Sequence, residues 1–158
     1  MAGFQFGVPA GFASDSYISA ALGVAAVSKL TDFDVGKAVK LIADSNYGLV
    51  ADGNDIEGVL VSVEPVTVND GFGFGTVQVK ERVVAINAGV GALTLGAYVV
   101  AAAQQAVGTA VTAVSSGPQT GVKGPNVKAG AGVLFKWRIV SLLGGAGAVG
   151  TPILIEKI

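Results

Sequence analysis

The chain contains no cysteine and no histidine among its 158 residues. Without cysteine it has neither a disulfide framework nor a thiolate nucleophile. Without histidine it lacks the usual general base near neutral pH and the commonest metal ligand in proteins. We therefore expect no catalytic residue, no metal ion and no cofactor, and we predict that the protein is not an enzyme.

Charge is also scarce, because only 13% of the residues are charged and the formal net charge is −1. Long-range attraction to nucleic acid or to anionic lipid is therefore not expected. An uncharged stretch over residues 83–122 is long enough to span a bilayer. However, glycines and polar amides interrupt it, and its apolar residues are mainly valine and alanine. The stretch predicts buried strands joined by turns, with no membrane partner.

What the chain has in abundance is small and β-permissive residues: 24 are glycine, and 51% of all residues are hydrophobic. A length of 158 residues suits one domain, which would bury about 68–70% of its unfolded surface without a disulfide or a metal. From residue 30 onward, short β-type runs alternate with turns. This pattern predicts an all-β domain over residues 30–158, either a small β-sandwich or a barrel.

Residues 58–88 carry the strongest β signal, with three apolar runs separated by a proline and by an Asn-Asp-Gly turn. Val59, Val61 and Val63 occupy alternate positions, which places them on one face of a strand. The alternation then slips by one residue at Pro65. Since proline cannot donate a hydrogen bond to a sheet, we expect a β-bulge or an edge position there.

The C-terminal third predicts two further strands. Alternation over residues 133–140 places Val133, Phe135, Trp137 and Ile139 toward the core, and the two cations Lys136 and Arg138 toward water. Residues 153–158 form the last strand, and residues 115–132 are interpreted as a long exposed loop. A similarity between residues 30–39 and 93–99, each with a glycine two positions before a strand, is interpreted as chance.

The first 29 residues differ from the rest because four aromatic residues lie among glycine, alanine and serine with no helical or strand period in the first part. The sequence allows a short helix over residues 18–27. The segment either packs on its own domain or forms an extended arm that reaches a partner. We predict such an arm over residues 1–29, with contacts made by Phe4, Phe6, Phe12 and Tyr17.

Motifs that could carry chemistry lack the context that they need. Gly145, Gly147 and Gly150 match the dinucleotide pattern, but Pro152 follows where a crossover helix should be, so we interpret them as a turn. The acidic residues over 52–57 lack the spacing of a calcium loop and have a common turn composition. Glu64 is expected to face solvent, with no catalytic carboxylate partner.

Residues 58–88, together with the ending over residues 137–158, resemble the capsid decoration, or cement, proteins of tailed bacteriophages. The resemblance implies a structural virion protein made in the host cytoplasm. It would bind the outer surface of a shell of major capsid protein, bridge neighbouring capsomers, and form a homo-oligomer, either a trimer or a dimer. The four arm aromatics would then be capsid contacts.

Two other functions stay open from the residues. One is a self-assembling tail-tube or minor shell subunit, which would polymerise without a capsid. The other is a carbohydrate-binding β module, which would need exposed aromatic residues.

Overall fold

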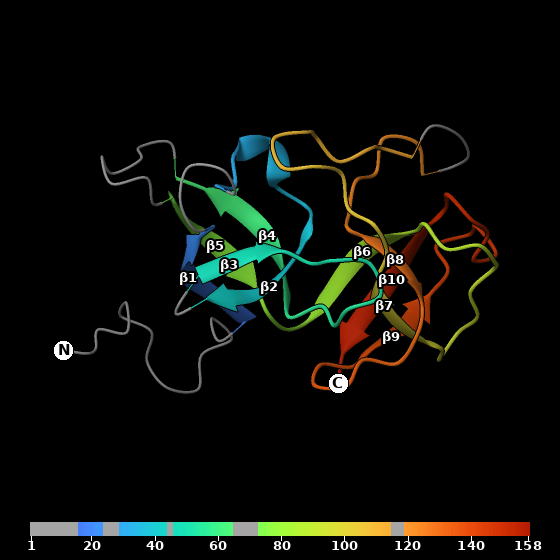
Figure 1. The fold of residues 1–158 in the computed structure, drawn as a ribbon. Coiled ribbons are helices and arrows are strands. Elements are labelled where there is room, and N and C mark those ends of the chain that lie inside the picture. Colours follow the sequence, from blue (N-terminus) through green and yellow to red (C-terminus); the bar gives the residue numbers. More distant parts are fainter. Residues whose placement is uncertain (1–15, 24–28, 44–45, 65–72, 115–118) are drawn as a thin grey trace.

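A computed structural model describes residues 16–23, 29–43, 46–64, 73–114 and 119–158. The arm candidates Phe4, Phe6 and Phe12 lie outside these ranges, as does Pro65 with its expected bulge. The regular structure of the described chain is almost entirely β, in two closed barrels that lie next to each other (Figure 1). The predicted all-β class is confirmed.

The first barrel contains five strands and one short 3₁₀ helix. Its cyclic order is β1-β3-β2-β4-β5, in which β1 runs parallel to β3 and every other pairing is antiparallel. The elements are β1 (Tyr17–Leu22), η3 (Asp32–Asp34), β2 (Ala38–Ala43), β3 (Asn46–Leu49), β4 (Gly58–Val63) and β5 (Gly73–Gln78).

The second barrel follows after a connection of three residues, 79–81. Its cyclic order is β6-β8-β7-β9-β10, and again the first and third strands are the parallel pair. The strands are β6 (Arg82–Asn87), β7 (Tyr98–Ala101), β8 (Asn126–Ala129), β9 (Trp137–Ser141) and β10 (Pro152–Lys157).

The two barrels therefore have the same topology, strand for strand, and their registers also agree. Leu60 pairs with Val77 in the first barrel, as Ile139 pairs with Ile155 in the second. Both registers shift at the next residue, so that Val61 in β4 and Val140 in β9 have no partner residue in the register. A β-bulge at the same place in both barrels indicates that one architecture occurs twice in the chain.

The similarity between residues 30–39 and 93–99 coincides with this duplication. Gly36 and Gly96 both have positive φ, of 93° and 79°, two positions before the second strand of their barrel. The main-chain N–H of Gly36 donates to the carbonyl oxygen of Leu60, and that of Gly96 donates to the carbonyl oxygen of Ile139. Each acceptor is the third residue of the fourth strand of its barrel. We had interpreted the similarity as chance, but the two segments occupy equivalent places in the two barrels.

Each barrel has an apolar interior, and the second core extends across the junction. Leu22, Leu30, Val39, Leu60 and Val77 belong to the buried cluster of the first barrel. The other cluster is built around Trp137 and Ile155, and it also includes residues of the first half of the chain, namely Ala38, Val50, Ile56 and Val59. The barrels are thus joined by continuous apolar packing.

Several local predictions are wrong. Residues 18–22 form most of β1 and not a helix, because β1 pairs over all six residues with β5. Tyr17 belongs to the same strand, so this part of the predicted arm lies in the first barrel. Val61 is exposed and Leu60 is buried, because the bulge ends the alternation there.

The predicted strand over residues 133–140 begins only at Trp137. Trp137 and Ile139 are buried and Arg138 is exposed, as expected. Val133, however, is 85% exposed instead of facing the core. The loop predicted over residues 115–132 contains a strand, β8.

Candidate functional site

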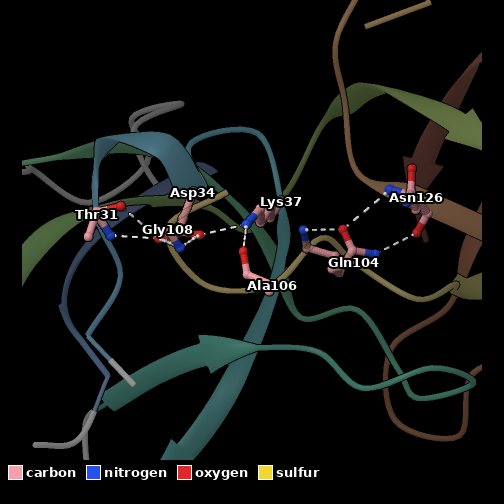
Figure 2. A network of polar contacts seen from close by, with 8 residues as sticks. Thr31, Asp34, Lys37, Gln104, Ala106, Gly108 and Asn126 are labelled. Atoms are coloured by element: carbon pink, nitrogen blue, oxygen red, sulfur yellow. Dashed lines mark hydrogen bonds and ion pairs between the residues drawn. The ribbon is translucent and has the colours of Figure 1, made fainter. Parts of the chain in front are cut away.

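The junction between the barrels contains a buried ion pair. Asp34 in η3 and Lys37, just before β2, both have no exposed surface, and Lys37 Nζ lies 2.6 Å from Asp34 Oδ1. Lys37 Nζ also donates to the carbonyl oxygen of Ala106, 2.7 Å away in the second half of the chain. Figure 2 shows Lys37 between these two acceptors.

The carboxylate of Asp34 accepts hydrogen bonds from three further donor groups, which belong to Gly108 and Thr31. The main-chain N–H of Gly108 donates to both of its oxygens, at 2.9 and 3.2 Å, and Thr31 donates its main-chain N–H and its hydroxyl. Burial would raise the pKa of Asp34, but the hydrogen bonds from Lys37, Thr31 and Gly108 outweigh it and lower the pKa. The ionised carboxylate therefore fastens residues 106–108 to the first barrel.

Gln104 makes a second connection beside this ion pair (Figure 2). Its side-chain amide donates to the carbonyl oxygens of Ala102 and Asn126, each at 2.8 Å. Its carbonyl oxygen accepts the main-chain N–H groups of Ala38 in β2 and Asn126 in β8. One side chain thus joins the two barrels through polar contacts.

The third connection involves loops that hold the same place in each barrel. Residues 50–57 connect β3 to β4, and residues 130–136 connect β8 to β9. The carboxylate of Asp55 in the first loop accepts main-chain N–H groups from Val133, Leu134 and Phe135 in the second, with shortest distances of 2.8, 2.6 and 3.3 Å. The two equivalent loops therefore meet at the junction.

Asp55 is ionised at neutral pH in this arrangement. Desolvation would raise its pKa, but the three main-chain donors and the nearby Lys40 lower the pKa below its usual range. Three successive N–H groups directed at one carboxylate form an anion-binding concavity, occupied here by a side chain of the same chain.

The other acidic residues of the 52–57 segment also have partners. Asp52 pairs with Lys128 at 2.7 Å, and the carboxylate of Glu57 accepts the Tyr47 hydroxyl and the main-chain N–H of Leu41. Burial and the hydrogen bond to Glu57 raise the pKa of Tyr47. In the described ranges, no group of three or more acidic residues is arranged to hold a metal ion.

The remaining motif residues are structural. Gly147 and Gly150 have positive φ, of 69° and 82°, in the turns before β10, which agrees with the interpretation of a glycine-rich turn. Glu64 is exposed, and Glu81 accepts a hydrogen bond of 2.8 Å from Ser16. The indole of Trp137 is buried and donates to the carbonyl oxygen of Ile56 at 2.9 Å.

A surface that sequence reasoning missed lies beside the Asp55 contacts. Val133, which alternation places toward the core, is 85% exposed, and Leu134, on the opposite face of the predicted strand with Lys136 and Arg138, is 80% exposed. Next to them is a hollow of about 680 Å³, whose lining includes Lys40, Leu41 and Phe135. We call Val133 and Leu134 the apolar tip. The hydrophobic runs in the sequence could not reveal it, because they predict burial.

Tyr17 is the one predicted contact residue that lies in the described chain. It is the first residue of β1, pairs with Gln78, and exposes 44% of its surface. It lies beside the connection between the barrels, where Ser16 accepts the main-chain N–H of Val79. The structure describes no contact between Tyr17 and the other three predicted aromatic residues, which lie outside the described ranges.

Comparison of the chain with protein-family models, curated proteins and solved structures finds no significant match. In the described part of the chain, no helix has the length and apolar character needed to cross a bilayer.

Proposed function

We propose that this chain is a structural virion protein that binds the outer surface of an assembled tailed-phage capsid and cements neighbouring capsomers. The observation that carries the proposal is the junction between two equivalent barrels, which is held by buried polar contacts and a shared apolar core. Asp34 and Lys37 form a fully buried ion pair that also holds the main chain at Ala106 and Gly108. A cement protein has to transmit load between the subunits that it joins, and two barrels locked together suit that task.

The resemblance of residues 58–88 and 137–158 to decoration proteins gives the proposal its partner, the major capsid protein. Weak contacts repeated over a shell are sufficient, because links to several subunits increase the effective concentration of each contact. We propose a dimer or trimer as the form that binds. Phe4, Phe6 and Phe12 remain proposed arm contacts in this scheme.

The proposal is tested by mixing the purified chain with empty, expanded shells of the phage that encodes it. We expect saturable co-sedimentation with the shells and an increase in the temperature at which the shells disrupt. Absence of binding would contradict the proposal. Light scattering of the chain alone is the companion measurement, since growth into long polymers would indicate a tail-tube or shell subunit instead.

The same assay tests the arm. Because Tyr17 is part of β1, the deletion should end at residue 15 and leave the first barrel complete. We expect the shortened chain to occupy fewer sites on the shell at equal concentration. Unchanged occupancy would exclude Phe4, Phe6 and Phe12 as capsid contacts without affecting the proposed function.

A further inference from the structure

The apolar tip is held in a fixed conformation, although it projects into solvent. The main-chain N–H groups of Val133 and Leu134 both donate hydrogen bonds to the carboxylate of Asp55. Just before them, Gly132 leaves no space for a side chain, because a Cβ atom there would overlap the carbonyl oxygen of Phe135. The loop is therefore hydrogen-bonded at residues 133–135 and closely packed at Gly132.

Joining the two loops accounts for the Asp55 contact, but not for the exposure of two large aliphatic side chains beside it. A loop in water does not need three of its N–H groups bound, since water can satisfy them. Rigid display of two large aliphatic side chains also leaves apolar surface exposed to solvent, which is unfavourable. In protein interfaces, however, an apolar anchor that is ordered before binding loses less conformational entropy when it enters a pocket.

Lysine side chains surround the tip. Lys136 follows it directly in the sequence and is exposed, Lys40 lines the adjacent hollow, and Lys157 Nζ lies 4.3 Å from the centre of the Phe135 ring. None of these three lysines forms an ion pair with another residue in the described segments.

Two nearby carboxylates offset part of this charge, because Asp55 interacts with Lys40 and Glu57 interacts with Lys157. Asp55 directs its oxygens to the N–H groups of the tip loop, and Glu57 directs its oxygens to Tyr47 and the N–H of Leu41. Lys157 Nζ also donates to the carbonyl oxygen of Glu57 at 2.9 Å. Three lysines against two carboxylates leave an excess of positive charge beside the tip, and Lys136 is the exposed lysine of the three, which favours a partner that carries negative charge.

We propose that Val133 and Leu134 form the anchor through which the chain binds the shell, and that their receptor on the capsid subunit is an apolar pocket with an acidic rim. The tip enters the pocket, and the exposed Lys136 faces carboxylates at the rim. Asp55 is a positioning residue, because it orders the tip without contacting the shell. This inference rests on the proposed function.

The test measures binding to expanded shells for the full-length chain and for two matched variants, Val133→Asp and Val90→Asp. Val90 is fully exposed on another loop, so the two variants make the same chemical change at two exposed valines. We expect Val133→Asp to weaken binding by about 30-fold or more, the loss that corresponds to an interface hot spot. Val90→Asp should bind as the wild type does.

Trp137 fluorescence and circular dichroism check that both variants fold. Binding by Val133→Asp at wild-type affinity, or an equal loss in both variants, would overturn the tip as the anchor while the proposed function stands. Failure of the wild type to bind would instead overturn the proposed function, and the anchor with it.

The acidic rim has its own readout. We expect the affinity of the wild type to fall as salt rises, and Lys136→Glu to reduce this salt dependence. Salt-independent binding of the wild type would overturn the acidic rim.

Discussion

At the scale of single residues, the Asp34–Lys37 ion pair is the group whose removal should matter most. Both side chains are fully buried, so each depends on the other to offset the loss of hydration. The pair formed by Lys128 and Asp52 has almost the same N···O distance, 2.7 Å, but its side chains are 31% and 55% exposed. The two pairs separate the effect of burial from the effect of geometry.

We predict that Lys37→Met lowers the free energy of unfolding by about 3–5 kcal/mol, because it leaves the carboxylate of Asp34 buried without a counter-charge. Lys128→Met should cost no more than about 1 kcal/mol, because water screens the exposed pair. Urea denaturation of both variants measures the difference. Equal costs would show that burial does not govern the strength of the Asp34–Lys37 contact.

Asp34 should also make stability depend on pH. Its pKa in the folded chain lies below the ordinary value of 3.8, so the ionised form favours the folded state. This contribution is present above the ordinary pKa, and it is lost as pH falls through the lowered pKa of the folded chain.

We therefore predict that the free energy of unfolding of the wild type decreases as pH falls below about 4. The free energy of unfolding of Asp34→Asn should decrease less steeply over the same interval. Urea denaturation between pH 6 and pH 2.5 gives both slopes. Asp55, whose pKa is lowered too, contributes equally to both proteins and does not affect the comparison. Identical slopes would contradict the role given to Asp34.

At the scale of elements, close packing between strands β4 and β5 depends on glycine. A Cβ atom on Gly75 would overlap the carbonyl oxygen of Ser62 and come within 2.7 Å of Leu22 Cδ1. A Cβ atom on Gly91, in the loop after β6, would meet nothing within 4 Å. The two positions therefore differ in the space that an added methyl group would find.

We predict that Gly75→Ala destabilises the protein by about 1–3 kcal/mol, because β4 or Leu22 must move to admit the methyl group. Gly91→Ala should change stability by no more than about 0.5 kcal/mol. Chemical denaturation of the two single variants tests this. A loss at Gly91 as large as that at Gly75 would contradict packing as the cause, because chain entropy alone makes a Gly→Ala substitution stabilising.

The elements also show where sequence patterns are informative. The burial of Trp137 and Ile139 with exposed Arg138 followed from alternation alone, because β9 is regular there. Alternation failed at Leu60 and Val61, since a bulge depends on the partner strand β5. It also failed at β1, whose small residues show no strand period and adopt their conformation through pairing with Gly73–Gln78.

The candidate site was predictable only in part. The acidic composition of residues 52–57 correctly indicated a turn, but nothing in the sequence shows that Asp55 binds residues 133–135. That contact spans 78 residues and exists only because two loops meet at the junction. Val133, which alternation places toward the core, is chemically indistinguishable from a core residue until its surroundings are known.

At the scale of the whole molecule, the main feature missed from the sequence is the duplication. The all-β class follows from local patterns, whereas barrel closure and the parallel pairing of first and third strands involve residues far apart in the chain. The trace of the duplication in the sequence was a few residues around Gly36 and Gly96. A backbone requirement for positive φ survives where side chains have diverged.

Closure of both sheets has a further consequence for how such a chain behaves in a crowded cell. Aggregation into cross-β fibrils begins when the unpaired edge of a sheet on one molecule pairs with an edge on another. In the described strands, each barrel closes on itself and presents no such edge. A chain with 51% hydrophobic residues and only 13% charged residues has little electrostatic repulsion against aggregation. Its protection lies in topology, which allows many copies to accumulate as separate folded molecules.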